Sequence, residues 1–158
     1  IPGVPLAIVF PEIEVSLIDA TAKKVRFIQE AVESLGLVNC QAVHGRAEEL
    51  GHDPGWRETR DIAVARAVGP LATLLEFAMP LLRTGGRAIF PKGILADDEV
   101  QAARRAAPIL SARLLPIAPL EPVPGCPVTQ VAQADKMGPI TERYPRRPGL
   151  PAREPLGG

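Results

Sequence analysis

Strand-like and helix-like segments alternate along most of this chain, and that alternation constrains its fold more than any other feature. Residues 14–19 and 40–45 are rich in β-formers and are expected strands. Between them, residues 21–35 place apolar side chains at helical spacing, and Gly36 follows as a helix stop. The first third of the chain therefore predicts one strand–helix–strand unit.

The same alternation continues into the second half of the chain. Residues 61–68 are an expected strand, and apolar spacing after Pro70 predicts a helix that reaches Leu82, unless Pro80 shortens or kinks it. Gly85 and Gly86 are expected to turn the chain into further segments. These are a strand over 87–92, a polar helix over 97–107, and two weaker strands over 111–120 and 128–135 that form an antiparallel finish. The whole pattern predicts an α/β fold with a mostly parallel sheet.

Composition excludes several classes of protein. The chain has 158 residues, of which 46% are hydrophobic and 23% charged, which is typical of a globular domain. No apolar run is long enough for a membrane span, and basic and acidic residues tie at 18 each, so net charge does not drive nucleic-acid binding. The two cysteines, Cys40 and Cys126, lie far apart, and neither His44 nor His52 has metal-ligand spacing. We therefore expect no metal site, no disulfide scaffold and a reducing cytoplasm.

Proline sets the end of the chain apart. Most of the 18 prolines follow residue 107, and the segment 143–153 carries arginines and no acid. This composition is typical of a solvated, proline-stiffened tail, and equally of an arm that binds phosphates. We expect one domain over residues 1–137 and a Pro/Arg-rich tail over 138–158.

Candidate site residues follow the expected strands, because open parallel sheets bind ligands beyond the carboxyl ends of their strands. Asp19 suits the two hydroxyls of a ribose, or the N-cap of the next helix. Ala47 and Glu48 suit an adenine edge, through a backbone N–H and a carboxylate, or a solvated first helical turn. Arg66 follows an apolar run, where a charge needs a partner. Lys92 follows the next strand and is either a ligand contact or merely solvated.

Six blocks of the sequence, in order, resemble the bacterial glucose-inhibited division protein B family. They are IPGVPLAIVFP (1–11), LIDATAKKVRFI (17–28), GRAEE (45–49), ARAV (65–68), FPKG (90–93) and YPRRPG (144–149). The family is a guanine-N7 methyltransferase of 16S rRNA that uses S-adenosylmethionine. The resemblance implies a class I S-adenosylmethionine-dependent methyltransferase fold, which is Rossmann-like, in a cytoplasmic enzyme that is a monomer without metal.

The resemblance also assigns roles to residues. Ile1 would follow the family's glycine-rich loop, Asp19, Ala20 and Thr21 would hold the ribose, Ala47 and Glu48 the adenine, and Arg66 the remaining part of the cofactor. The family's first strand and glycine-rich loop should precede Ile1, so the chain is expected to be a fragment. The segment 125–137 matches the family's last strand only loosely, and Gly69 stands where the family more often has alanine.

The expected chemistry needs no catalytic residue, because guanine N7 already carries a lone pair and loses no proton before it attacks a methyl group. The expected partner is 16S rRNA or a small-subunit precursor. Its phosphates would contact a set of basic residues: Arg46, Lys92, Arg143, Arg146 and Arg147. Two other functions stay open. An NAD-dependent dehydrogenase would also place an acid such as Asp19 on a ribose, and a chain without the glycine loop could be a non-enzymatic RNA-binding remnant.

Overall fold

The computed structural model describes residues 2–121, 125 and 129–158, and it divides the chain into two compact units, Ile1–Ala47 and Glu48–Gly158. The expected boundary at residue 137 therefore falls inside the second unit. Residues 138–158 belong to that unit as well. Whether they form a tail with a separate function stays a prediction. Within the described residues, no helix is long and apolar enough to cross a membrane.

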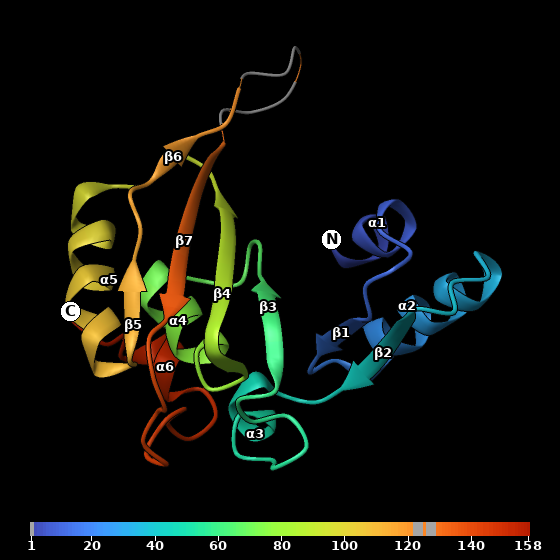
Figure 1. Cartoon of the computed structure of the whole chain (residues 1–158), viewed down its shortest axis with the longest axis horizontal. Helices are drawn as coiled ribbons and strands as arrows, with labels where there is room; N and C mark the ends of the chain where they lie inside the picture. Colours follow the sequence, from blue (N-terminus) through green and yellow to red (C-terminus); the bar gives the residue numbers. More distant parts are fainter. Residues whose placement is uncertain (1, 122–124, 126–128) are drawn as a thin grey trace. The chain divides into compact units, whose positions relative to one another are not determined.

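The first unit is the predicted strand–helix–strand, preceded by a short helix that the sequence had not indicated (Figure 1). Its elements are α1 (Gly3–Val9), β1 (Val15–Asp19), α2 (Ala22–Ser34) and β2 (Cys40–His44). β1 and β2 pair in parallel from Val15 opposite Cys40 to Asp19 opposite His44. The amide of Asn39 donates to the carbonyls of Ala7, Phe10 and Ile13, and so fastens the end of α1. The strands predicted at 14–19 and 40–45 and the helix at 21–35 are confirmed.

The second unit is built on a mixed sheet. Its elements are α3 (Ala47–Leu50), which straddles the division, β3 (Arg60–Val64), α4 (Leu71–Ala78), β4 (Leu82–Lys92), α5 (Asp97–Ile109), β5 (Ala112–Leu114), β6 (Ala118–Pro119), β7 (Gln130–Lys136) and α6 (Leu150–Arg153). The strand order is β3-β4-β7-β5, and β6 also pairs with β7 (Figure 1). β3 and β4 are parallel, whereas β7 runs antiparallel to its neighbours. The predicted α/β class and its antiparallel finish are confirmed.

Two predicted boundaries are wrong around β4. The helix expected to reach Leu82 ends at Ala78, in line with the alternative that Pro80 shortens it, and Leu82 already begins β4. Gly85 and Gly86 lie inside β4 rather than in a turn before it. Gly86 is required there, because a Cβ on it would lie 2.9 Å from the carbonyl oxygen of Asp61 on the neighbouring strand. Gly86 thus permits a close approach of β3 and β4.

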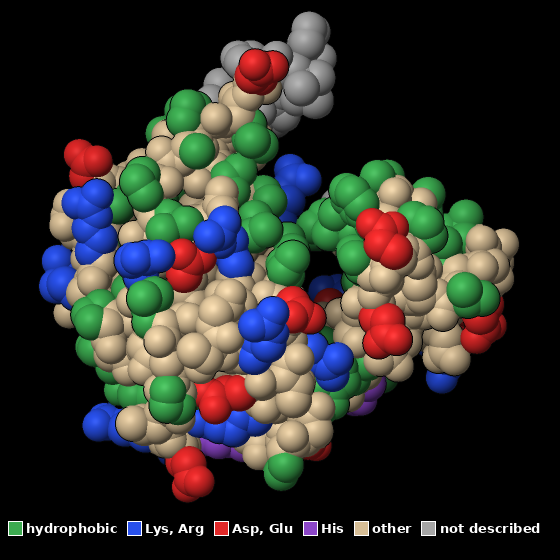
Figure 2. Space-filling model, viewed as in Figure 1, with side chains coloured by type: hydrophobic (Ala, Val, Ile, Leu, Met, Phe, Trp, Pro, Cys, Tyr) green, Lys and Arg blue, Asp and Glu red, His purple; other side chains and the backbone are tan. Residues whose placement is uncertain are grey.

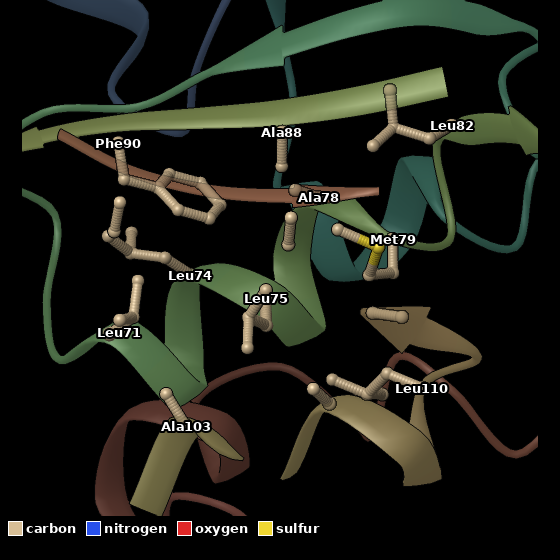
Figure 3. Close-up of a cluster of buried hydrophobic side chains, with 14 of the residues drawn as sticks. Leu71, Leu74, Leu75, Ala78, Met79, Leu82, Ala88, Phe90, Ala103 and Leu110 are labelled. Atoms are coloured by element: carbon tan, nitrogen blue, oxygen red, sulfur yellow. The ribbon is translucent and has the colours of Figure 1, made fainter. Parts of the chain in front are cut away.

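The core of the second unit lies between its sheet and helices α4 and α5 (Figure 3). α4 is apolar nearly all round, with Leu71, Leu74 and Leu75 fully buried. Phe90 of β4 packs against the α4 side, and Ala103 of α5 closes the other side (Figure 3). Small residues on α5 allow this close approach of the two helices. The central position of α4 makes its one acidic residue, Glu76, the most constrained group of the unit.

The carboxylate of Glu76 is fully buried and is paired with Arg146. Arg146 donates to it from its backbone N–H at 2.8 Å, from Nε at 2.9 Å and from one terminal nitrogen at 2.7 Å. The hydrogen bond to Glu76 raises the pKa of Arg146 above its usual value, although burial opposes that shift. Arg146 is thereby part of the folded core rather than of a solvated arm.

Further contacts fasten the rest of residues 139–158, which we term the C-terminal strap. The Arg57 guanidinium donates to the strap carbonyls of Ile140, Thr141 and Tyr144 at 2.9–3.0 Å. The hydroxyl of Thr73 donates to the carbonyl of Pro151 at 2.8 Å. These carbonyl groups of the strap accept hydrogen bonds from side chains, whereas the carbonyl groups of a helix or a sheet accept them from the backbone. The strap is an ordered segment of the second unit.

We expect Glu76→Met to destabilise the second unit by about 3–5 kcal/mol, because the substitution leaves a mostly buried guanidinium without its anionic partner. The double variant Glu76→Met/Arg146→Met should cost clearly less, because neither charge then remains in the core. The free energy of unfolding of the full-length protein is measured by urea titration, with the fluorescence of Trp56 as the reporter within the second unit. The exposed pair Arg153–Glu154 provides the control, since Glu154→Gln should change stability little. Equal losses in the single and double variants would contradict the pairing.

Candidate functional site

The carboxyl end of β1 carries the first set of predicted site residues, Asp19, Ala20 and Thr21. Oδ1 of Asp19 accepts the backbone N–H of Thr21 at 2.8 Å, and Oδ2 lies 3.5 Å from Nζ of Lys24. The N-cap of α2 is Thr21, without a side-chain hydrogen bond, so Asp19 orders the turn before the helix and is not itself the cap. Ala20 and Thr21 are exposed beside it. The turn holds a carboxylate at the end of a parallel strand.

Asp19 is poised as an anion. Its side chain is 29% exposed. Partial burial raises the pKa of Asp19, but the hydrogen bond from Thr21 and the charge of Lys24 outweigh burial and hold it below the ordinary value. The carboxylate is therefore ionised at neutral pH and retains lone pairs that can accept hydroxyl groups.

The carboxyl end of β2 lies beside that of β1, because the two strands pair in parallel with Asp19 opposite His44. The ring Nε2 of His44 lies 3.2 Å from the carbonyl of Ala20, which joins the two strand ends. Ala47 follows β2 by a short turn and is half-buried. The first unit thus brings Asp19, Ala20 and Ala47 to one end of its sheet.

Glu48, the first residue of the second unit, has a partner within that unit that the sequence did not indicate. Its side chain is buried, and Oε1 accepts the backbone N–H of Gly149 in the strap at 2.9 Å. Gly149 has φ of 82°, a conformation that glycine adopts without strain. One oxygen of Glu48 therefore serves the strap, and a role toward adenine stays a prediction.

Arg66 lies on the loop that joins β3 to α4. It follows the end of β3 by two residues and is exposed, so the expectation of a buried charge after an apolar run is wrong. β3 ends at Val64, which leaves Arg66 outside the sheet. Its guanidinium has no hydrogen bond or ion pair within the part of the chain that the structure describes. Ala67 beside it adopts φ of 58°, a left-handed conformation that costs an alanine energy.

Lys92 ends β4 and reaches back to the same loop. Its Nζ donates to the carbonyl of Gly69 at 2.9 Å and to Oε1 of Glu99 at 2.6 Å. The same Glu99 oxygen accepts the backbone N–H of Leu71, the first residue of α4, at 2.9 Å. The charge of Lys92 is thus already matched within the second unit.

The four arginines predicted to contact RNA phosphates differ in their exposure and in their partners. Arg143 and Arg147 are exposed on the strap, and Arg143 stacks 5.7 Å from the ring centroid of Tyr144. Arg46 is exposed in the first unit, whereas Arg146 is paired with Glu76. On the face in Figure 2, the basic side chains of the second unit stand among acidic ones. The structure shows no uniformly basic surface on that face.

Three residues with structural or site roles escaped the sequence analysis. Glu76 had a usable signal, because a lone acid within an apolar helix needs a buried partner. Glu99 and Ala67 had none, because an acid in a first helical turn is common and a left-handed alanine leaves no mark in sequence. Ile1 lies outside the described residues, as does Cys126. Among the residues that the structure describes, no group of His, Cys, Asp and Glu could hold a metal ion.

Solved structures resemble the chain in fold. The antibiotic-resistance methyltransferase Kmr matches with a TM-score of 0.66 at 15% identity, over 86% of this chain and 81% of that one. TYW2 of M. jannaschii, solved in complex with AdoMet, matches with a TM-score of 0.62 at 15% identity, over 87% of this chain and 63% of that one. The fold is therefore that of class I methyltransferases, as predicted.

Relatives of known name resemble the chain in sequence. The ribosomal RNA small subunit methyltransferases G of Roseiflexus castenholzii and Chloroflexus aggregans are 42% and 39% identical over 155 residues. That of Deinococcus radiodurans is 41% identical over 156 residues. Each alignment covers 98% of this chain, but the chain spans only 66%, 65% and 61% of the respective relatives.

A family model also matches most of the chain. Residues 1–121 match the family GidB, described as rRNA small subunit methyltransferase G. The matched range contains Asp19, Ala47, Arg66 and the fastening residue Lys92. The chain therefore belongs to the GidB family, rRNA small subunit methyltransferase G.

Proposed function

We propose that the protein transfers a methyl group from S-adenosylmethionine to N7 of a guanine in 16S ribosomal RNA. The observation that carries this proposal is the ionised carboxylate of Asp19 at the carboxyl end of β1, within the range that matches a family of small-subunit rRNA methyltransferases. A substrate within ribosomal RNA or a small-subunit precursor implies action in the bacterial cytoplasm.

The residues at the strand ends fit the cofactor's chemistry. The Asp19 carboxylate keeps its charge and has acceptor capacity beyond the Thr21 N–H, which suits the two hydroxyls of a ribose. Ala20 and Thr21 are exposed beside it and leave room for the sugar. The backbone of Ala47 would meet the adenine, and Glu48 would contribute only its second oxygen, because Gly149 occupies the first.

Arg66 fits the charged end of the cofactor. Its exposed guanidinium has no partner in the described part of the chain, and S-adenosylmethionine carries a carboxylate on its amino-acid portion. Guanidinium and carboxylate match in charge and in planar, two-pronged geometry. We therefore assign Arg66 to the amino-acid portion and Asp19 to the ribose.

The reaction asks for position rather than for a proton acceptor. When bound, S-adenosylmethionine supplies an electrophilic methyl group on a sulfonium. Guanine N7 has an in-plane lone pair and no proton to lose, so the protein's task is to hold the base in line with that methyl group. We accordingly assign no general base.

Contact with RNA phosphates falls to the exposed arginines of the strap. Arg143 and Arg147 keep their guanidiniums at the surface on a segment that Arg57 and Glu76 fasten. A fastened arginine loses less conformational entropy on binding than one on a flexible arm. Such contacts give affinity without sequence discrimination, so the shape of the RNA supplies the specificity. Arg46 is a further candidate on the first unit.

The first experiment tests the ribose contact in the full-length protein. Asp19→Asn keeps an oxygen for the Thr21 N–H but loses the charge, and it should weaken S-adenosylmethionine binding roughly ten- to a hundredfold, as expected for a lost hydrogen bond to a charged group. Calorimetry measures the affinity, with NAD as a comparison ligand. Since the pKa of Asp19 is lowered, wild-type affinity should stay constant with falling pH until below the ordinary carboxyl range.

Asp53 provides the matched control for Asp19. Its Oδ1 accepts the backbone N–H of Gly55 at 2.7 Å in a turn of the same kind. Asp53→Asn should therefore leave cofactor affinity unchanged. Unaltered affinity in Asp19→Asn would mean that the carboxylate only orders its turn, and tighter binding of NAD than of S-adenosylmethionine would indicate a dehydrogenase.

The second experiment tests the strap arginines against 16S RNA. Arg143→Ala/Arg147→Ala should weaken RNA binding and lower the slope of log affinity against log salt by about two at most, because two phosphate contacts are lost. Cofactor affinity should not change. Arg113→Ala, which removes an exposed arginine paired with Asp135, is the control. Mass spectrometry of the RNA product should find the methyl group at N7, and a methyl group on an exocyclic amine would refute the proposed reaction.

The third experiment concerns residues 1–158 expressed alone. In the described residues β1 pairs only with β2, and β3 pairs with β4 but with no strand on its other side. Unpaired strand edges are costly when buried and prone to aggregate when exposed. We expect this chain to aggregate or stay partly folded, without saturable S-adenosylmethionine binding. A single cooperative thermal transition together with micromolar binding would contradict this.

A further inference from the structure

We infer that Lys92 and Glu99 are positioning residues, which hold the β3–α4 loop in the conformation that presents Arg66 to the cofactor. The inference rests on the proposed function for the identity of the ligand. It assigns Lys92 to cofactor affinity rather than to RNA phosphates, and it gives Glu99 a role that the sequence did not indicate.

The pair grips the loop close to its end. The loop covers residues 65–70, between the end of β3 and the start of α4. Lys92 Nζ donates to the carbonyl of Gly69, and Glu99 Oε1 accepts the backbone N–H of Leu71. The ion pair of 2.6 Å between Lys92 and Glu99 joins these two contacts. A backbone acceptor and a backbone donor on either side of Pro70 are thus satisfied by one pair of side chains.

The other end of the loop is held by the sheet. The backbone N–H of Ala65 donates to the carbonyl of Ile89 on β4 at 3.3 Å, and Ala65 packs against the core. Arg66, Ala67 and Val68 therefore lie between two fixed points. Arg66 and Val68 expose their side chains, so packing contributes little to their conformation.

Ala67 shows why the loop needs a fastening. Its φ of 58° places an alanine in the left-handed region, which costs of the order of 1 kcal/mol and persists only where the surroundings impose it. Without the Lys92 contact, Ala67 would relax to negative φ and the adjacent Arg66 would change direction. The Lys92–Glu99 pair thus holds in place the loop whose backbone strain lies at Ala67.

The environment of Lys92 argues against a phosphate contact. Its side chain is only 18% exposed and that of Glu99 25% exposed. A phosphate would have to approach the Glu99 carboxylate, whose charge repels it, or to replace that carboxylate as the partner of Lys92. The amide of Leu95, which follows Lys92 closely, is bound to the side chain of Gln130, so this side of the β4–α5 connection is also fixed.

The test uses Lys92→Met in the full-length protein, with three measurements. S-adenosylmethionine affinity by calorimetry should fall about tenfold, the change expected when a charge-assisted hydrogen bond is lost. Binding of a 16S RNA fragment without cofactor, and its salt slope, should not change. Hydrogen exchange should become faster at the amides of residues 65–71.

Two further variants separate positioning from loss of folding. Lys92→Arg keeps a donor and a charge and should recover part of the cofactor affinity. Lys92→Met/Ala67→Gly should also recover part of it, because glycine adopts the left-handed conformation without the cost to alanine. A variant that merely failed to fold would not be rescued by a substitution in the loop.

The outcomes distinguish this inference from the proposed function. If Lys92→Met leaves cofactor affinity and loop exchange unchanged but lowers the RNA salt slope by about one, Lys92 is a phosphate contact and the inference is overturned. If the wild-type protein does not bind S-adenosylmethionine, the proposed function fails. Loop exchange then still decides whether Lys92 holds the loop.

Discussion

The buried carboxylate of Glu76 is the interaction on which the architecture of the second unit depends. A charge at the centre of an apolar helix is tolerated only with a partner of opposite charge and hydrogen bonds to its oxygens. Arg146 meets that need from a position 70 residues later in the chain. The strap must therefore fold against α4, and its carbonyls then require donors such as Arg57. The buried carboxylate of Glu76 thus requires the C-terminal strap to be ordered.

The sequence predicted what local patterns determine and missed what distant pairing determines. Local patterns located four elements almost to their ends: β-forming residues predicted β1 and β2, apolar periodicity predicted α2, and the order of acidic and basic residues predicted α5. The segment after residue 138 has the composition of a solvated arm, and only its distant partners make it ordered. The Gly85-Gly86 pair resembled a turn for the same reason, since the role of Gly86 depends on the neighbouring strand β3.

The candidate site was predictable to the extent that parallel strands determine it. Asp19 and Arg66 were predicted as site residues because ligands bind beyond the carboxyl ends of such strands. The prediction could not tell which polar side chains would already be occupied. Glu48 is held by Gly149 and Lys92 by Glu99, through contacts between segments that no local pattern relates. Ala67 was equally invisible, because its backbone conformation is imposed by the two ends of its loop.

Charged side chains that are paired within the protein and those that are not have different roles. A ligand that binds a paired group must first break the pair, and the loss of a partner in a mostly buried pair such as Glu76–Arg146 is itself costly. A ligand that binds Arg66 or Arg147 meets a guanidinium already at the surface and displaces only water. The charged residues that fasten the strap and the β3–α4 loop are therefore poor ligand contacts, and they fix the direction of the neighbouring residues that are good ones. In the proposed function, affinity at Arg66 and at Arg147 consequently depends on side chains that touch no ligand.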